Sequence, residues 1–369
     1  MSARYRAEQI GSLLRPTELL AARDRFAAGA ATRDELTAAE DRAIEQALEM
    51  QRQVGLDVFV DGEYRRRSYM MGLYDAVEGF EVPPAASEGS SIWRGKPLDG
   101  YPRVNYPVAA GKLKARGRLA AREASFLKEH SPGPWKVTLP GAQMIGSTAF
   151  RAGLTEPFYA TRGELMAELA GLLRQEVQAL VADGVPYVQI DAPAYTQFAD
   201  PLWRQRLERG GTNLEAAISE AIAADNAIVD GLAGKVTLGF HLCRGNSGGQ
   251  WLSEGGYDPI AEQLFSELRY DTFLLEYDTD RAGDFAPLRF MPSDRVVVLG
   301  LITTKSPDME SPDELLRRIE AAARYIPMEN LALSPQCGFA SSIPGNPLSW
   351  DEQRRKLELV VQTAAKAWG

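Results

Sequence analysis

The sequence predicts a (β/α)8 TIM barrel, with a doubly wound open sheet as the main alternative. Two observations favour the barrel: short apolar runs alternate with helical segments along the chain, and polar residues follow most of these runs. The runs are apolar or β-branched without alternation, as expected for parallel strands covered on both faces. The length of 369 residues is compatible with one large domain. We therefore expect a single barrel over residues 1–369.

Eight runs are candidates for the barrel strands, and the first of them is the weakest. Each is short enough for a strand and is bounded by polar or turn-forming residues. The candidates are Ala7–Gly11, Asp57–Gly62, Lys136–Gly141, Pro186–Ala192, Lys235–His241, Asp271–Glu276, Arg295–Thr303 and Asn330–Gln336.

The segments between these runs carry helix start and stop signals. Five starts fit the capping box, in which a hydroxyl and a glutamate three residues later satisfy the free amides of the first turn. Asp258 before Pro259 is a further candidate cap. Gly55, Gly184 and Gly234 suit left-handed helix ends. The five capping boxes begin at Thr32, Thr161, Thr212, Ser311 and Ser349, the last opening a final helix over 349–368.

One stretch, residues 64–135, is too long for a simple strand-to-helix connection. Residues 82–93 indicate a loop, residues 101–117 alternate like a hairpin, and residues 119–130 indicate a helix. We interpret the whole stretch as an insertion after the second strand, at the barrel mouth, and as a candidate lid or oligomer contact.

Composition excludes several classes of protein. The net charge is −9 and the only basic run is Arg65–Arg67, which argues against nucleic acid or an anionic membrane surface as partner. Two cysteines in a chain of this length do not form a disulfide framework, which indicates a reducing compartment. The N-terminus lacks an apolar signal core, and no run approaches the roughly 20 residues of a membrane span. We expect a cytoplasmic protein.

The ends of the predicted strands carry the candidate chemistry, because a barrel places its active site at the carboxyl ends of its strands. His241 and Cys243 are two residues apart, so both can face the same way. Cys337 ends the eighth strand, and Glu276 ends the sixth, next to the fifth. Imidazole, thiolate and carboxylate are zinc ligands. A lone His-x-Cys is more often plain packing, but with Cys337 and Glu276 in register a metal site is favoured.

Acidic groups at other strand ends indicate the kind of substrate. Glu63 and Asp191 are ordinarily explained as helix caps or salt-bridge partners. Several acids at one mouth also suit a ligand that carries an ammonium group. Ser12, with the Gly11 backbone, can hold a carboxylate through hydroxyl and N–H donors. Together these groups fit an α-amino acid.

The same residues resemble a known family. The chain is similar to the C-terminal half of cobalamin-independent methionine synthase, and most of all to short, single-barrel members of that superfamily. The matching segments lie in family order over nearly the whole chain: Ile10–Ser12, Asp61–Glu63, Gln189–Pro193, His241–Cys243, Leu274–Glu276 and Ser334–Gly338.

The resemblance implies both a cofactor and a reaction. It implies zinc held by His241, Cys243, Glu276 and Cys337, and homocysteine contacted by Ile10, Ser12, Glu63 and Asp191. The zinc-bound thiolate would attack a methyl donor to form methionine. The donor is left open between methyltetrahydrofolate, a methylated corrinoid and another methyl source, and a homo-oligomer is an open alternative to a monomer.

The chain also departs from that family pattern. A tryptophan of the folate pocket falls at Thr148, and the histidine after strand seven falls around Lys305, a candidate acid or anion-binding group. The acid expected after Asp191 is Ala192. The second, N-terminal barrel of full-length synthases has no counterpart in the sequence. The pattern thus keeps the zinc and homocysteine half and leaves the folate half open.

Three alternatives remain on the sequence alone. An epoxide-opening coenzyme M transferase has a similar zinc site, but its thiol carries a sulfonate and no ammonium, which disfavours Glu63 and Asp191 as neighbours. A metal-free porphyrinogen decarboxylase-like lyase has no use for three soft ligands. A barrel with a purely structural zinc would have all four coordination places filled by protein.

Overall fold

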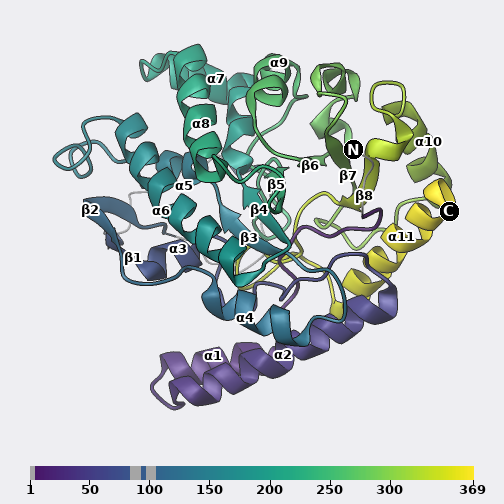
Figure 1. Cartoon of the computed structure of the whole chain (residues 1–369), viewed down its shortest axis with the longest axis horizontal. Helices are drawn as coiled ribbons and strands as arrows, with labels where there is room; N and C mark the ends of the chain where they lie inside the picture. The colour runs from purple at the N-terminus through teal and green to yellow at the C-terminus, as the bar shows by residue number, and fades with distance from the viewer. Residues whose placement is uncertain (1–4, 84–92, 97–104) are drawn as a thin grey trace.

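The computed structural model describes residues 5–83, 93–96 and 105–369 of the chain. Its central sheet has six parallel strands that pair in chain order, from β3 to β8, with the helices around the outside (Figure 1). Each lies within one of the last six predicted runs or extends it by one residue. The strands are β3 (Val137–Pro140), β4 (Tyr187–Asp191), β5 (Thr237–Leu242), β6 (Thr272–Glu276), β7 (Val296–Ile302) and β8 (Leu331–Pro335).

Two N-terminal segments close this sheet into a ring, which confirms the predicted barrel. Ala7 pairs in parallel with Leu333 of β8, and Phe59 pairs in parallel with Trp135, just before β3. The Asp57 amide donates to the Ala7 carbonyl at 3.0 Å and so joins the two segments. The sheet therefore continues from β8 through both segments to β3.

These two segments make isolated bridges and not the continuous strands expected over 7–11 and 57–62. The side chain of Gln51 explains part of the difference. Its Nε2 donates to the Val60 carbonyl at 2.9 Å, and the Val60 amide donates to its Oε1 at 3.0 Å. A side chain thus takes both backbone groups that a strand ladder would use.

The helices largely begin and end where the sequence indicated, with four corrections. Thr32 and Ser349 form complete capping boxes, and Thr161 caps through its hydroxyl. Asn213, and not Thr212, caps α8, because its amide oxygen accepts from the Ala216 N–H. Asp258 lies inside α9, which Tyr257 precedes as the N-cap, and Ser311 makes no side-chain cap bond. Helix α8 ends at Val229, so Gly234 does not cap it. Gly55 and Gly184 are left-handed C-caps, as predicted.

The longer helices lie mostly on the outer side of the barrel, and the described residues also form four short 3-10 helices in its connections. Within the described ranges, no helix is long and apolar enough to cross a membrane. The helices are α1 (Thr17–Ala27), α2 (Arg33–Val54), α3 (Met71–Ala76), α4 (Ala121–His130), α5 (Ala142–Ala149), α6 (Arg162–Asp183), α7 (Pro201–Arg209), α8 (Leu214–Val229), α9 (Asp258–Glu267), α10 (Pro312–Ala322), α11 (Trp350–Trp368), η1 (Pro193–Phe198), η2 (Asp280–Ala282), η3 (Ala286–Phe290) and η4 (Met328–Asn330).

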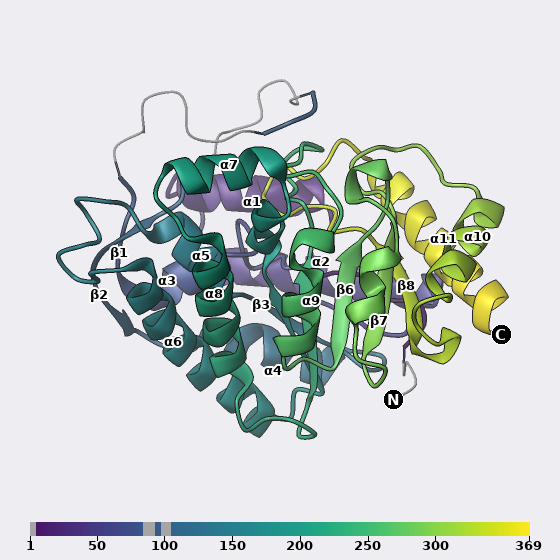
Figure 2. The ribbon, with the colours of Figure 1, turned by 90° about the horizontal axis from the view of Figure 1, so that it is seen from above.

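The stretch 64–135 contains α3, an antiparallel pair of strands and α4. The pair joins β1 (Val77–Glu81) to β2 (Val108–Ala115), so the hairpin expected inside 101–117 is wrong: its second half pairs back to residues before the predicted loop. Residues 84–92 and 97–104 of this stretch lie outside the described residues. Figure 2 shows β1 and β2 at one edge of the molecule, with α10 and α11 at the opposite edge.

The barrel interior positions the strand ends. Leu274, Val298 and Ala332 lie side by side on β6, β7 and β8 and form a small apolar cluster inside the ring. His241 pairs with Leu274 in register and therefore faces the same side, as does Glu276, two residues further along β6. The interior face thus turns from apolar to polar as the strands reach their carboxyl ends.

Candidate metal centre and substrate cavity

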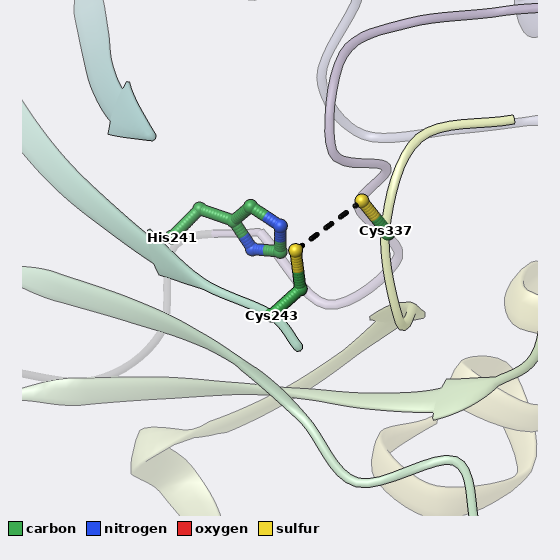
Figure 3. Close-up of side chains that lie close together, drawn as sticks. All are labelled: His241, Cys243 and Cys337. Atoms are coloured by element: carbon green, nitrogen blue, oxygen red, sulfur yellow. Dashed lines mark hydrogen bonds between the residues drawn. The ribbon is translucent and has the colours of Figure 1, made fainter. Parts of the chain in front are cut away.

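His241, Cys243 and Cys337 come together at the carboxyl ends of β5 and β8. Their ligand atoms all lie within 4.8 Å of one another, and the three side chains are buried. Figure 3 shows His241 and Cys243 on one side and Cys337 facing them from the segment after β8, with the two sulfur atoms 3.6 Å apart. Two thiolates on a tetrahedral zinc, each with a Zn–S bond of about 2.3 Å, lie roughly 3.8 Å apart. The spacing therefore fits a zinc ion.

The imidazole of His241 is oriented for ligation. Its Nδ1 lies 3.0 Å from the Leu274 carbonyl oxygen, which fixes the proton on Nδ1. Its Nε2 is buried and has no hydrogen-bond partner among the described residues. A carbonyl on one ring nitrogen with a free lone pair on the other is the usual arrangement of a metal-binding histidine.

The two cysteines differ in their acid–base state. The hydrogen bond with Cys243 lowers the pKa of Cys337 well below its ordinary value, and His241 lowers it further. The same hydrogen bond, together with burial, raises the pKa of Cys243 well above that of a free thiol. The pair therefore holds one thiolate readily, and a cation is needed to hold two.

Glu276 ends β6 as expected but is held by arginines in this structure. Its Oε1 accepts from the Arg281 side chain at 2.9 and 3.1 Å, and its Oε2 accepts from the Arg244 backbone amide at 2.7 Å. Burial raises the pKa of Glu276, but the surrounding cations outweigh it and the net shift is downward. The structure therefore brings three of the four expected ligands together and leaves Glu276 beside them as an ion-paired carboxylate.

Lys305 is not among the residues that line the cavity beside the His–Cys–Cys group. Its ammonium donates to the Gly245 carbonyl at 2.8 Å, to Asn246 Oδ1 at 3.1 Å and to the Gln250 carbonyl at 3.4 Å. Because the three contacts engage the ammonium's N–H donors, this lysine holds the loop after β5 in place. The geometry supports a structural role for Lys305 better than a role as proton donor.

The acidic pair expected near an ammonium group is buried in the same cavity. Burial raises the pKa of Glu63 to about 7 and that of Asp191 to about 6. Glu63 Oε1 accepts from the Thr138 hydroxyl at 2.8 Å, whereas its buried Oε2 has no partner among the described residues. Asp191 accepts from Gln189 Nε2 at 2.7 Å. Two crowded carboxylates with a free oxygen favour a cationic ligand.

Glu63 also has an unusual backbone. Its φ of +58° makes it the one non-glycine residue in the described ranges with a left-handed conformation. Such a conformation costs of order 1 kcal/mol or more and persists where surrounding contacts fix it. Here the Glu63 amide donates to Asp61 Oδ1 at 3.0 Å, which holds the turn that aims the carboxylate inward.

A cavity of about 470 Å³ joins the acidic pair to the His–Cys–Cys group. Ile10 and Ser12 line it as expected. The sequence did not predict the aromatic residues that line this cavity, and Tyr195 and Phe198 of η1 are buried outside it. The aromatic lining is instead Tyr69, Trp93, Tyr106, Phe150 and Trp203, and the first three come from the 64–135 stretch.

The fold and this site define a (β/α)8 barrel with a candidate metal centre at its catalytic mouth. The family model described as the catalytic domain of cobalamin-independent synthase matches residues 6–97 and 147–366. The chain belongs to this family, whose named members include methyltransferases.

Individual relatives agree with that assignment. YxjH of Bacillus subtilis, which is uncharacterised, is 33% identical over 99% of this chain and 95% of that protein. The 5-methyltetrahydropteroyltriglutamate–homocysteine methyltransferase of Saccharomyces cerevisiae is 24% identical over 96% of this chain but 41% of its own length. A Listeria monocytogenes crystal structure, provisionally described as a vitamin-B12-independent methionine synthase, matches with a TM-score of 0.75 and 27% identity, covering 100% of this chain and 99% of that one.

Proposed function

We propose that this protein is a zinc-dependent thiol S-methyltransferase that uses homocysteine as acceptor and forms methionine. The observation that carries the proposal is one cavity that joins a buried His–Cys–Cys group to two buried carboxylates, Glu63 and Asp191, of which Glu63 has an oxygen without a partner among the described residues. The first suits a thiolate-binding metal, and the second suits the ammonium group of an amino acid. The zinc ligands would be His241, Cys243 and Cys337, with Glu276 as a candidate fourth.

The acceptor would be held by residues at both sides of the barrel closure. Glu63 and Asp191 would bind the ammonium group, with the free Oε2 of Glu63 as the aimed acceptor. Ser12 and the Ile10 segment would bind the carboxylate, and Gln189 fixes this arrangement by donating to both the Ile10 carbonyl and Asp191. A bound zinc would supply deprotonation of the substrate thiol at neutral pH.

The aromatic part of the cavity would take the methyl donor. Thr148 lines it at the position where the family resemblance expects the folate-stacking tryptophan, with Arg151 nearby as a cation. Methyltetrahydrofolate and a methylcorrinoid both remain candidate donors. We further propose that residues 64–135 are an insertion on a single barrel and that its described parts border this side of the cavity, since Tyr69 and Tyr106 line it.

Three alternatives are less well supported. The acidic pair disfavours a sulfonated thiol such as coenzyme M, because Glu63 and Asp191 would repel it. A structural zinc needs no cavity at its side, whereas His241, Cys243 and Cys337 all line this one. A lyase without metal leaves the buried Nε2 of His241 unexplained.

The test is a methyl-transfer assay on the purified protein after zinc analysis. Homocysteine and coenzyme M are compared as acceptors, each with methyltetrahydrofolate and with free methylcobalamin, before and after removal of zinc by a chelator. We expect methionine to form only with homocysteine and only in the zinc-loaded protein. Retention of full activity after complete zinc removal would overturn the proposal, as would a preference for coenzyme M.

A further inference from the structure

The Glu276 carboxylate accepts two hydrogen bonds from one arginine, and both converge on the same oxygen. Arg281 reaches its Oε1 through both Nε, at 3.1 Å, and Nη2, at 2.9 Å. The Glu276 side chain is fully buried, and 11% of the Arg281 side chain is exposed. Charge-assisted pairs of this geometry are among the stronger hydrogen bonds in proteins. The carboxylate is therefore not a free ligand waiting for an ion.

Arg281 is itself fixed from three sides. Its Nη2 donates to both oxygens of Asp278, at 2.8 and 3.0 Å. Its guanidinium lies 4.9 Å from the ring centre of Trp251, and its carbonyl accepts from the Gly255 amide at 2.9 Å. The Arg244 amide holds the other oxygen of Glu276. These contacts fix the arginine in its position beside the metal site.

We propose that Arg281 is a positioning residue that competes with zinc for the Glu276 carboxylate, so that the fourth coordination place stays available to the substrate thiolate. The inference rests on the proposed zinc-dependent function. Zinc sites with four firm protein ligands are structural, whereas catalytic sites keep three and an open position. His241, Cys243 and Cys337 already supply three. A carboxylate shared with an arginine is a weaker fourth ligand than a free one.

The test measures zinc affinity, which requires neither donor nor turnover. Full-length protein without zinc is titrated with zinc against a chromophoric chelator, as wild type, Arg281→Met and Arg281→Lys. Freeing Glu276 should tighten zinc binding about tenfold or more in Arg281→Met, a change of the size seen when a residue that supports a metal ligand is removed but opposite in sign. Arg281→Lys keeps the positive charge but loses the paired N–H donors of the guanidinium, so it should tighten zinc binding less. This variant carries the test if Arg281→Met does not fold. Unchanged or weaker zinc binding in the folded variants would overturn the proposal.

A double variant separates the role of Glu276 from a simple loss of positive charge. In a Glu276→Gln background, Arg281→Met should leave zinc affinity within about twofold, since there is no carboxylate to release. If the tightening persists there, it is a through-space charge effect and the proposal is wrong. Arg289→Met is the matched control, because Arg289 is an exposed arginine that pairs with Asp258 away from the site.

The coordination sphere gives a second readout. The visible absorption of the cobalt(II)-substituted protein should change on addition of homocysteine in the wild type and should need a higher homocysteine concentration in Arg281→Met. If both proteins need the same homocysteine concentration for this change, Glu276 and the substrate thiolate do not compete for the fourth coordination position. If the wild type binds no zinc at all, the proposed function fails first; if it binds zinc and the arginine variants do not differ, this inference alone fails.

Discussion

The buried Glu63 carboxylate gives the sharpest prediction for acceptor binding. Its Oε2 has no partner in the described structure, and burial raises its pKa to about 7. If this oxygen accepts a hydrogen bond from the ammonium group of homocysteine, the bond is charge-assisted and worth about 1.5–3 kcal/mol. Glu63→Gln preserves size and the Thr138 contact but removes the charge. Its homocysteine dissociation constant should therefore rise roughly 10- to 150-fold.

The raised pKa of Glu63 also predicts how homocysteine binding depends on pH. The ammonium needs the ionised carboxylate, so binding is complete above the pKa of Glu63, about 7, and weakens as the pH falls below it. The affinity of the wild type should fall roughly tenfold per unit on the acid side. In Glu63→Gln only the Glu63 contribution should disappear, and the dependence that comes from Asp191 and from loss of the thiol proton to zinc should remain.

Calorimetric titration of homocysteine into zinc-loaded protein between pH 6 and 8 measures both effects. Glu358→Gln is the matched control, because Glu358 is a partly exposed helix residue paired with Arg354. Its affinity should equal that of the wild type at every pH. The reasoning fails if Glu63→Gln binds homocysteine as tightly as the wild type at pH 8, or if wild-type affinity does not change with pH.

Three further predictions concern the metal, the loop and the fold. His241→Ala should lose most of its zinc by elemental analysis; full zinc content would exclude this ligand. Lys305→Met should lower the melting temperature yet keep its zinc, and a large loss of kcat at unchanged stability would instead indicate catalysis. Asp225→Ala removes the acceptor of two amides at the start of α5, at 2.7 and 3.3 Å, and should cost about 1–3 kcal/mol in urea unfolding without changing zinc affinity; an unchanged unfolding midpoint would contradict it.

The sequence predicted that His241, Cys243 and Cys337 lie together because their geometry is local to strand ends. His241 and Cys243 face the same side because side chains in a strand alternate with a period of two. Cys337 follows β8, which is three strands from β5 around the barrel. The position of Glu276 was predicted, but its partner was not. Arg281 reaches it through the turn at η2, and such loop conformations leave no periodic signal.

The aromatic lining shows a second limit of prediction. Tyr69, Trp93 and Tyr106 belong to the described parts of the 64–135 stretch, and they reach the cavity through contacts between residues distant in sequence. The Arg94 amide, for example, donates to the Trp251 carbonyl at 2.8 Å. The error at Thr212 has a simpler cause: Asn213 beside it is an equally good cap, so pattern alone cannot choose between them.

The two halves of the site lie on parts of the barrel that are held by different numbers of backbone hydrogen bonds. His241, Cys243 and Cys337 follow strands of the continuous six-stranded sheet, whereas Ser12 and Glu63 follow the two segments that join it through isolated bridges. Few backbone bonds hold that seam, so it should open before the rest of the sheet in hydrogen exchange. The His–Cys–Cys group would then stay assembled while the side of the cavity that carries Ser12 and Glu63 opens transiently and gives a ligand a way in.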